Sequence, residues 1–151
     1  MPIDRDTALA HVLTPVRVQV ERGALRFFAT ATGETRPEYV DPEAARAAGH
    51  RDLPVPPTYF FSLELQGPDP LGFLGDLGVD LRGVLHGEQW FEYVTEACAG
   101  DTLTLRARLV DVVDKKGGAM QLLTKETTVT DDATGDLVAR LGAVLVLRDV
   151  A

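Results

Sequence analysis

A short run of residues that is apolar on nearly every side constrains the fold of this chain most. Residues 58–65 read Thr-Tyr-Phe-Phe-Ser-Leu-Glu-Leu, directly after Pro56 and Pro57. A helix that is apolar all round must be surrounded by protein. Prolines are tolerated at its start, because the first N–H groups of a helix have no partner within the helix. We therefore predict a buried helix over residues 54–65, and a fold that encloses it.

Five other stretches have the composition or the period-two alternation of β-strands. In residues 102–113, for example, Leu103, Leu105 and Leu109 alternate with threonine and arginine, as expected for a half-buried strand. The five predicted strands cover residues 15–21, 84–94, 102–113, 119–130 and 137–147. Strands that follow helices indicate an α+β domain. We predict one domain over residues 1–151, with an antiparallel sheet of about five strands wrapped around the buried helix.

Shorter elements lie between the first strand and the later ones. Residues 24–32 have helical spacing and end at Gly33, and residues 41–48 form a small helix with Asp41 as its N-cap. Residues 68–83 are punctuated by glycine, proline and aspartate but also contain several leucines. We expect a loop there that packs on the body, with about one helical turn. Residues 115–118 close a hairpin.

Charge and composition exclude several classes of function. The formal net charge is -8, which disfavours nucleic-acid binding. No apolar run approaches a membrane span, and the N-terminus has no apolar segment of the signal-peptide kind. A single cysteine, Cys98, makes no internal disulfide, so we expect a reducing, cytoplasmic location. The three histidines lack ligand spacing with Cys98, so neither a metal nor another cofactor is expected.

Several motifs, taken in order, resemble the MaoC-like dehydratases. They are YVDPEAARAAG at residues 39–49, LPVPPT at 53–58, LHGEQWFEY at 85–93 and AGDTL at 99–103. The chain is most similar to the N-terminal, fatty-acid-synthase-type subfamily, which includes the non-catalytic subunit of the mycobacterial β-hydroxyacyl-ACP dehydratase. The resemblance covers about residues 15–148. It implies a hot-dog fold and an acyl-CoA or acyl-ACP thioester as the ligand.

The chain departs from this family where the catalytic members carry Gly-Asp-x-Asn-Pro-x-His. The matching residues 33–39 read GETRPEY, so Glu34 replaces the aspartate and Tyr39 replaces the histidine. Dehydration needs an acid and a base within hydrogen-bond reach of the substrate. An ordinary phenol, with a pKa of about 10, is a poor substitute for histidine. The departure favours a non-catalytic subunit.

Seven residues are candidates for the site, each with a structural alternative. Glu34, Tyr39 and His86 are the catalytic candidates. The alternatives are a surface ion pair of Glu34 with Arg36, a half-buried Tyr39 that anchors its loop, and a structural His86 on the Trp90 face of its strand. The substrate-binding candidates are Pro57, Thr58, Tyr59 and His50. The first three could offer N–H donors at a helix start, or only cap and pack it. His50 could equally be a solvent-facing loop residue.

Three functions stay open. In the first, the chain pairs with a second hot-dog chain that carries the intact Asp/His dyad, and together they dehydrate (R)-3-hydroxyacyl thioesters or hydrate enoyl-CoA. In the second, it is a homodimeric hydratase or thioesterase that uses Glu34, His50 or His86. In the third, it binds acyl-CoA without catalysis. A dimer is expected in each case, because the sheet edge and the apolar last strand need covering.

Overall fold

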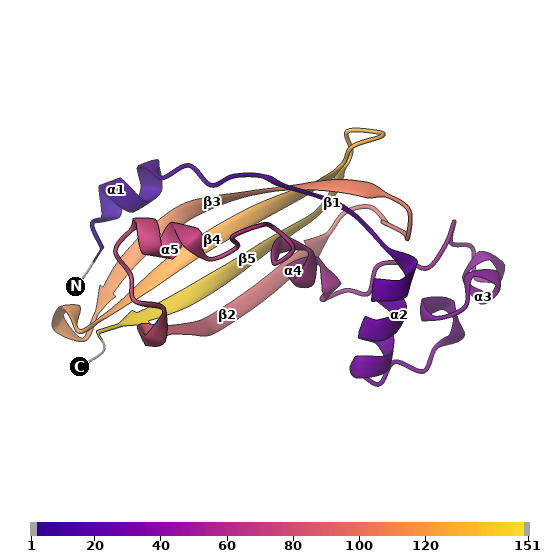
Figure 1. The fold of residues 1–151 in the computed structure, drawn as a ribbon, viewed down its shortest axis with the longest axis horizontal. Helices are drawn as coiled ribbons and strands as arrows, with labels where there is room; N and C mark the ends of the chain where they lie inside the picture. The colour runs from indigo at the N-terminus through magenta and orange to yellow at the C-terminus, as the bar shows by residue number, and fades with distance from the viewer. Residues whose placement is uncertain (1–2, 150–151) are drawn as a thin grey trace.

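One antiparallel sheet forms the body of the molecule. The computed structural model describes residues 3–149, and Figure 1 shows its long strands lying side by side. The strands are β1 (Val16–Gln19), β2 (Val84–Tyr93), β3 (Thr102–Lys115), β4 (Met120–Asp131) and β5 (Leu137–Arg148). Their order across the sheet is β1-β3-β4-β5-β2, so β1 and β2 are its edges. The predicted α+β class and all five predicted strands are confirmed.

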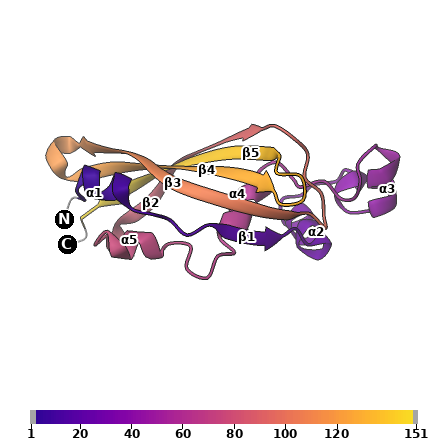
Figure 2. The ribbon, with the colours of Figure 1, turned by 90° about the horizontal axis from the view of Figure 1, so that it is seen from above.

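The helices are short and occupy two places. Helices α4 and α5 lie along one face of the sheet, and α2 and α3 extend beyond one of its ends (Figures 1 and 2). The α-helices are α1 (Arg5–Ala10), α2 (Arg22–Ala31), α3 (Pro42–Ala47), α4 (Tyr59–Glu64) and α5 (Gly72–Asp76). Single 3-10 turns are η1 (Pro37–Tyr39), η2 (Leu81–Gly83) and η3 (Lys116–Gly118). Helix α1, which packs on β3, was not predicted.

The local signals for caps and turns are confirmed. The Asp41 side chain accepts a hydrogen bond from the Glu43 N–H at 3.0 Å, which satisfies one of the unpaired donors at the start of α3. Gly33 follows α2 with a φ of 71°, a left-handed conformation that glycine adopts without a Cβ penalty. The predicted helical turn inside residues 68–83 is α5, whose Phe73 and Leu74 are buried.

The predicted helix over residues 54–65 is too long, because only residues 59–64 are helical. Pro54 instead forms a β-bridge with Cys98. The prolines hold the approach to the helix in an extended conformation, since the residue before a proline disfavours the α region. Phe60 and Leu63 are buried, Phe61 is half-buried and Leu65 is exposed. The helix is therefore packed against the inner face of the sheet on one side and only partly covered on the other.

The inner face of the sheet carries two apolar clusters rather than one. One cluster joins α2 and α4 to one end of the sheet and includes Leu25, Leu63 and Val129. The other joins α5 and the N-terminal segment to the opposite end and includes Phe73 and Leu123. Along β4, Thr127 and Lys125 lie between Val129 and Leu123, at alternate positions that share a face. Thr127 and Lys125 therefore form a polar belt that separates the two apolar clusters.

A β-bulge places His86 on the inner face, so its predicted place beside Trp90 is wrong. The pairing of β2 with β5 shifts register between His86 and Glu88, which leaves Gly87 as the extra residue. A Cβ at Gly87 would lie 2.9 Å from a Val146 methyl group, so the close approach favours glycine. Trp90 pairs with Gly142 on the outer face. The bulge reverses the alternation, and the His86 ring contacts Phe61 of α4.

Candidate functional site

Glu34 and Tyr39 meet at Arg36, in the segment between α2 and α3. Glu34 Oε2 pairs with Arg36 Nη2 at 2.8 Å, and its Oε1 accepts the backbone N–H groups of Thr35 and Arg36 at 2.9 and 3.0 Å. These bonds, led by the Arg36 side chain, lower the pKa of Glu34 to about 2. The Arg36 guanidinium lies 4.7 Å from the centroid of the half-buried Tyr39 ring. The expected surface ion pair is confirmed, and the carboxylate is held ionised.

His50 lies in a second place, in the segment after α3. Its Nδ1 hydrogen-bonds to Glu96 Oε1, and Glu96 Oε2 accepts from the Cys98 thiol at 3.4 Å. The His50 side chain is half-buried rather than solvent-facing. Burial raises the pKa of the fully buried Cys98 thiol, which disfavours the thiolate form that a nucleophile needs. A carboxylate that orients an imidazole is a common feature of acid/base sites.

His86 and the start of α4 form a third place, which is rich in aromatic rings. The ring centroids of His86 and Phe61 are 5.2 Å apart, and those of Tyr59 and Phe28 are 5.0 Å apart. Pro57 and Thr58 are exposed just before the helix. The Tyr59 N–H donates to the Pro56 carbonyl at 3.0 Å, so this donor is already used within the chain. Burial raises the pKa of the Tyr59 phenol.

The seven candidates therefore do not form one constellation. Among residues 3–149, no hydrogen bond, ion pair or ring contact links the Glu34, His50 and His86 groups to one another. Their roles in catalysis and binding stay predictions. The same residues contain no cluster of three or more His, Cys, Asp or Glu that would hold a metal ion. They also contain no helix long and apolar enough to cross a membrane.

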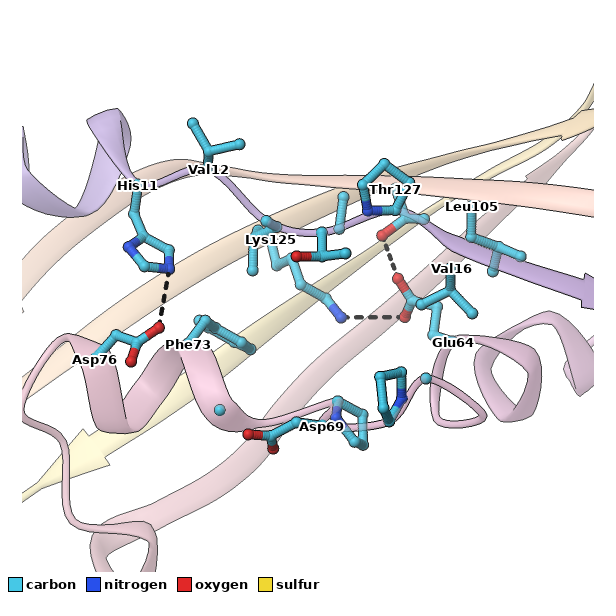
Figure 3. Close-up of a pocket in the computed structure, with 18 residues that line it drawn as sticks. His11, Val12, Val16, Glu64, Asp69, Phe73, Asp76, Leu105, Lys125 and Thr127 are labelled. Atoms are coloured by element: carbon cyan, nitrogen blue, oxygen red, sulfur yellow. Dashed lines mark hydrogen bonds and ion pairs between the residues drawn. The ribbon is translucent and has the colours of Figure 1, made fainter.

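A cavity lies elsewhere, at the polar belt of the core. It has a volume of about 270 Å³ and opens between residues 11–16, the segment after α4, and strands β3 and β4 (Figure 3). Glu64, the last residue of α4, receives a hydrogen bond from the Thr127 hydroxyl and one from Lys125 Nζ at 3.2 Å. The Lys125 and Glu64 side chains are only 14% and 7% exposed. At the mouth, His11 Nε2 lies 3.6 Å from Asp76 Oδ2.

Sequence reasoning did not select this group, although the pattern held a signal for it. Glu64 is the one charged residue in the apolar run 58–65. Lys125 stands at an inward position of β4, where the alternation calls for an apolar residue. One charge on a helix that was predicted to be buried implies a partner of opposite charge, because buried charges are rarely left alone. The two positions are distant in sequence, so only the fold shows that they meet.

The family of the FAS1-like, dehydratase domain region matches residues 7–141 of the chain. The chain is also 38% identical over 130 residues to a UPF0336 protein of Streptomyces griseus, which covers 86% of this chain and 85% of the relative.

Solved structures show the same arrangement of strands and helices. The HadBC complex of Mycobacterium tuberculosis, a 3R-hydroxyacyl-ACP dehydratase, is 26% identical with a TM-score of 0.74, over 86% of this chain and 89% of that one. The ChsH1-ChsH2 complex of the same organism is 24% identical with a TM-score of 0.74, over 97% and 94% of the two chains. These likenesses confirm the predicted fold.

Proposed function

The chain belongs to the FAS1-like dehydratase domain region family and has the hot-dog fold of the MaoC-like dehydratases, and from this membership we propose that it is the non-catalytic subunit of a heterodimer that dehydrates (R)-3-hydroxyacyl thioesters. A second hot-dog chain with an intact Gly-Asp-x-Asn-Pro-x-His motif supplies the acid and the base. This chain completes the acyl groove and stabilises the pair. The thioester is carried by CoA or by acyl carrier protein.

The observation that carries the proposal is the state of Glu34. Its carboxylate is bonded to Arg36 and to two backbone N–H groups, and its pKa is lowered to about 2. A general base works best when its pKa lies near the operating pH. A carboxylate held so far below that value has little tendency to take a proton from carbon. Tyr39, which stacks on the same guanidinium, offers no replacement for the histidine of the motif.

The edge strand β2 supports pairing with a second chain. Within residues 3–149 it has a neighbouring strand on one side only, and a free sheet edge is able to pair with another strand. Trp90, Tyr93 and Val94 are large apolar side chains on or beside this strand, and each is at least 39% exposed. Exposed apolar surface of this kind marks interfaces. The HadBC and ChsH1-ChsH2 structures are both complexes of two different chains.

Co-expression with a hot-dog chain that carries the intact motif tests the proposal. We expect the two chains to co-purify and to hydrate crotonyl-CoA at least ~10²-fold faster than either chain alone, the scale of acid/base catalysis. In this chain, Glu34→Gln and Tyr39→Phe should leave the rate nearly unchanged, as should the matched control Glu38→Gln. Asp→Asn at the motif of the second chain should abolish turnover. Loss of turnover in Glu34→Gln would contradict a non-catalytic role.

The His50–Glu96 hydrogen bond favours one second candidate, a homodimeric hydratase or thioesterase. In that case the purified chain alone turns over crotonyl-CoA or an acyl-CoA ester, and His50→Gln removes the activity. Glu96→Gln should lower it less, because the histidine keeps a hydrogen-bond partner. If the chain alone is stabilised by acyl-CoA in a thermal shift but no chain combination turns it over, the acyl-CoA-binding function replaces both candidates.

A further inference from the structure

The polar belt of the core, formed by Lys125 and Thr127 of β4 with Glu64 of α4, is unfavourable for the free energy of folding. A function of the belt would explain why it is present. Lys125 and Glu64 lie between two apolar clusters, with little exposure to water. Removing two charges from water costs several kcal/mol per ion, and a well-packed apolar pair is often as stable or more so. A chain that only needed a stable core would have leucine or valine at Lys125, as it has at Leu123 and Val129 on the same face.

The belt also has hydrogen-bonding capacity that the described residues do not use. Lys125 Nζ carries three donors, and within residues 3–149 it donates one hydrogen bond, to Glu64. Each Glu64 oxygen receives one hydrogen bond and keeps a further lone pair. Figure 3 shows the two groups meeting among the residues that line the cavity. A donor and an acceptor with unused hydrogen-bonding capacity therefore stand side by side on the wall of the cavity.

The other residues that line the cavity restrict the charge and the size of a ligand that could bind beside Lys125 and Glu64. Val16, Phe73 and Leu105 give it apolar walls. Three carboxylates line it, those of Glu64, Asp69 and Asp76, against the single ammonium of Lys125 and the imidazole of His11, so an anionic ligand is disfavoured. At ~30 Å³ per water, a volume of about 270 Å³ equals roughly nine waters and suits a body of about eight to ten non-hydrogen atoms.

We propose that this cavity binds a compact neutral alcohol, whose hydroxyl oxygen accepts a hydrogen bond from Lys125 and whose hydroxyl proton is donated to Glu64. A hydroxyl is both donor and acceptor, so it satisfies both members of the pair at once. The apolar body of the alcohol fills the space between the two clusters. None of the residues that line the cavity is among the seven candidates for the thioester site, so this site is separate from the proposed function.

Binding of cyclohexylmethanol to the full chain, followed by NMR of valine and leucine methyl groups, tests the proposal. We expect saturable shifts of the Val16 and Leu105 methyl signals with a Kd of about 1 mM, reasonable for so small a ligand. The methyl ether of the same alcohol only accepts a hydrogen bond, and cyclohexanecarboxylate is an anion. Both should bind at least ~10-fold more weakly, since each leaves one buried group unpaired or adds a like charge.

Two variants of the chain separate this site from unspecific binding. Ala107→Phe fills the cavity from β3 and should abolish the shifts, with the fold checked by circular dichroism. The double variant Glu64→Leu with Lys125→Met replaces both charged side chains by apolar ones. It should destabilise the fold less than removal of one charge, because no unpaired charge stays buried. It should bind the alcohol and the ether equally. Equal binding of all three probes to the unchanged protein, or no saturable shift with the alcohol, would overturn the proposal.

Discussion

The chain places one glutamate, Glu34, on its surface and another, Glu64, in its interior, and both are paired with a basic side chain. Glu34 is bonded to Arg36 two residues away, in a loop where water reaches both groups. Glu64 is bonded to Lys125, sixty-one residues away, between two apolar clusters. The first pair holds a local carboxylate ionised, and the second ties α4 to β4. An ion pair thus fixes one loop at the surface, whereas in the core it connects a helix to the sheet.

The largest expected difference between the two pairs is their effect on stability. Lys125→Met leaves the Glu64 charge buried without its partner, and we expect the free energy of unfolding to fall by about 3–5 kcal/mol. Urea denaturation followed by circular dichroism measures it. The double variant with Glu64→Leu should recover most of the loss, because no charge stays buried. A loss in Lys125→Met no larger than in Arg36→Met would remove the contrast.

A smaller effect is expected from the hydroxyl that also binds Glu64. Thr127→Val keeps the shape of the side chain but removes its donor to the buried carboxylate. We expect the free energy of unfolding to fall by about 1.5–3 kcal/mol, the usual range for a hydrogen bond to a charged group. Thr128→Val, at the neighbouring exposed position of β4, is the matched control and should change stability little. Equal effects of the two substitutions would mean that the bond adds nothing.

The smallest effect on stability is expected at the surface pair of Glu34 and Arg36. Loss of this pair should change mainly the pKa of Glu34. The pKa of Glu34 is lowered to about 2, chiefly by the Arg36 side chain. Since the folded pKa lies below the unfolded one, its contribution to stability is present above the unfolded value and disappears as the pH falls toward 2. In Arg36→Met, NMR of the Glu34 carboxyl carbon should show a higher midpoint, nearer the ordinary value of about 4.3. An unchanged midpoint would show that Arg36 is not the cause.

Some elements were predicted correctly from the sequence and others were not, and the difference has a physical reason. Strands β2 to β5 are long enough for their period-two patterns to outweigh local exceptions, and Asp41 and Gly33 act through bonds within a few residues. Helix α1 has only one buried residue, Ala8, so its six residues gave no periodic signal. The face of His86 was wrong because one extra residue, Gly87, reverses every side chain before it.

The sequence by itself determined the class of fold, the places of the strands and the replacement of the motif residues at Glu34 and Tyr39. The fold class and the strands follow from periodicity among neighbours along the chain, and the replacement of the motif residues follows from the resemblance to the MaoC-like family. Only the tertiary structure decided that Glu64 meets Lys125, that His50 pairs with Glu96 and that a cavity opens beside the belt. These contacts join residues far apart in sequence. Their energies depend on burial, which the packing of the whole sheet determines.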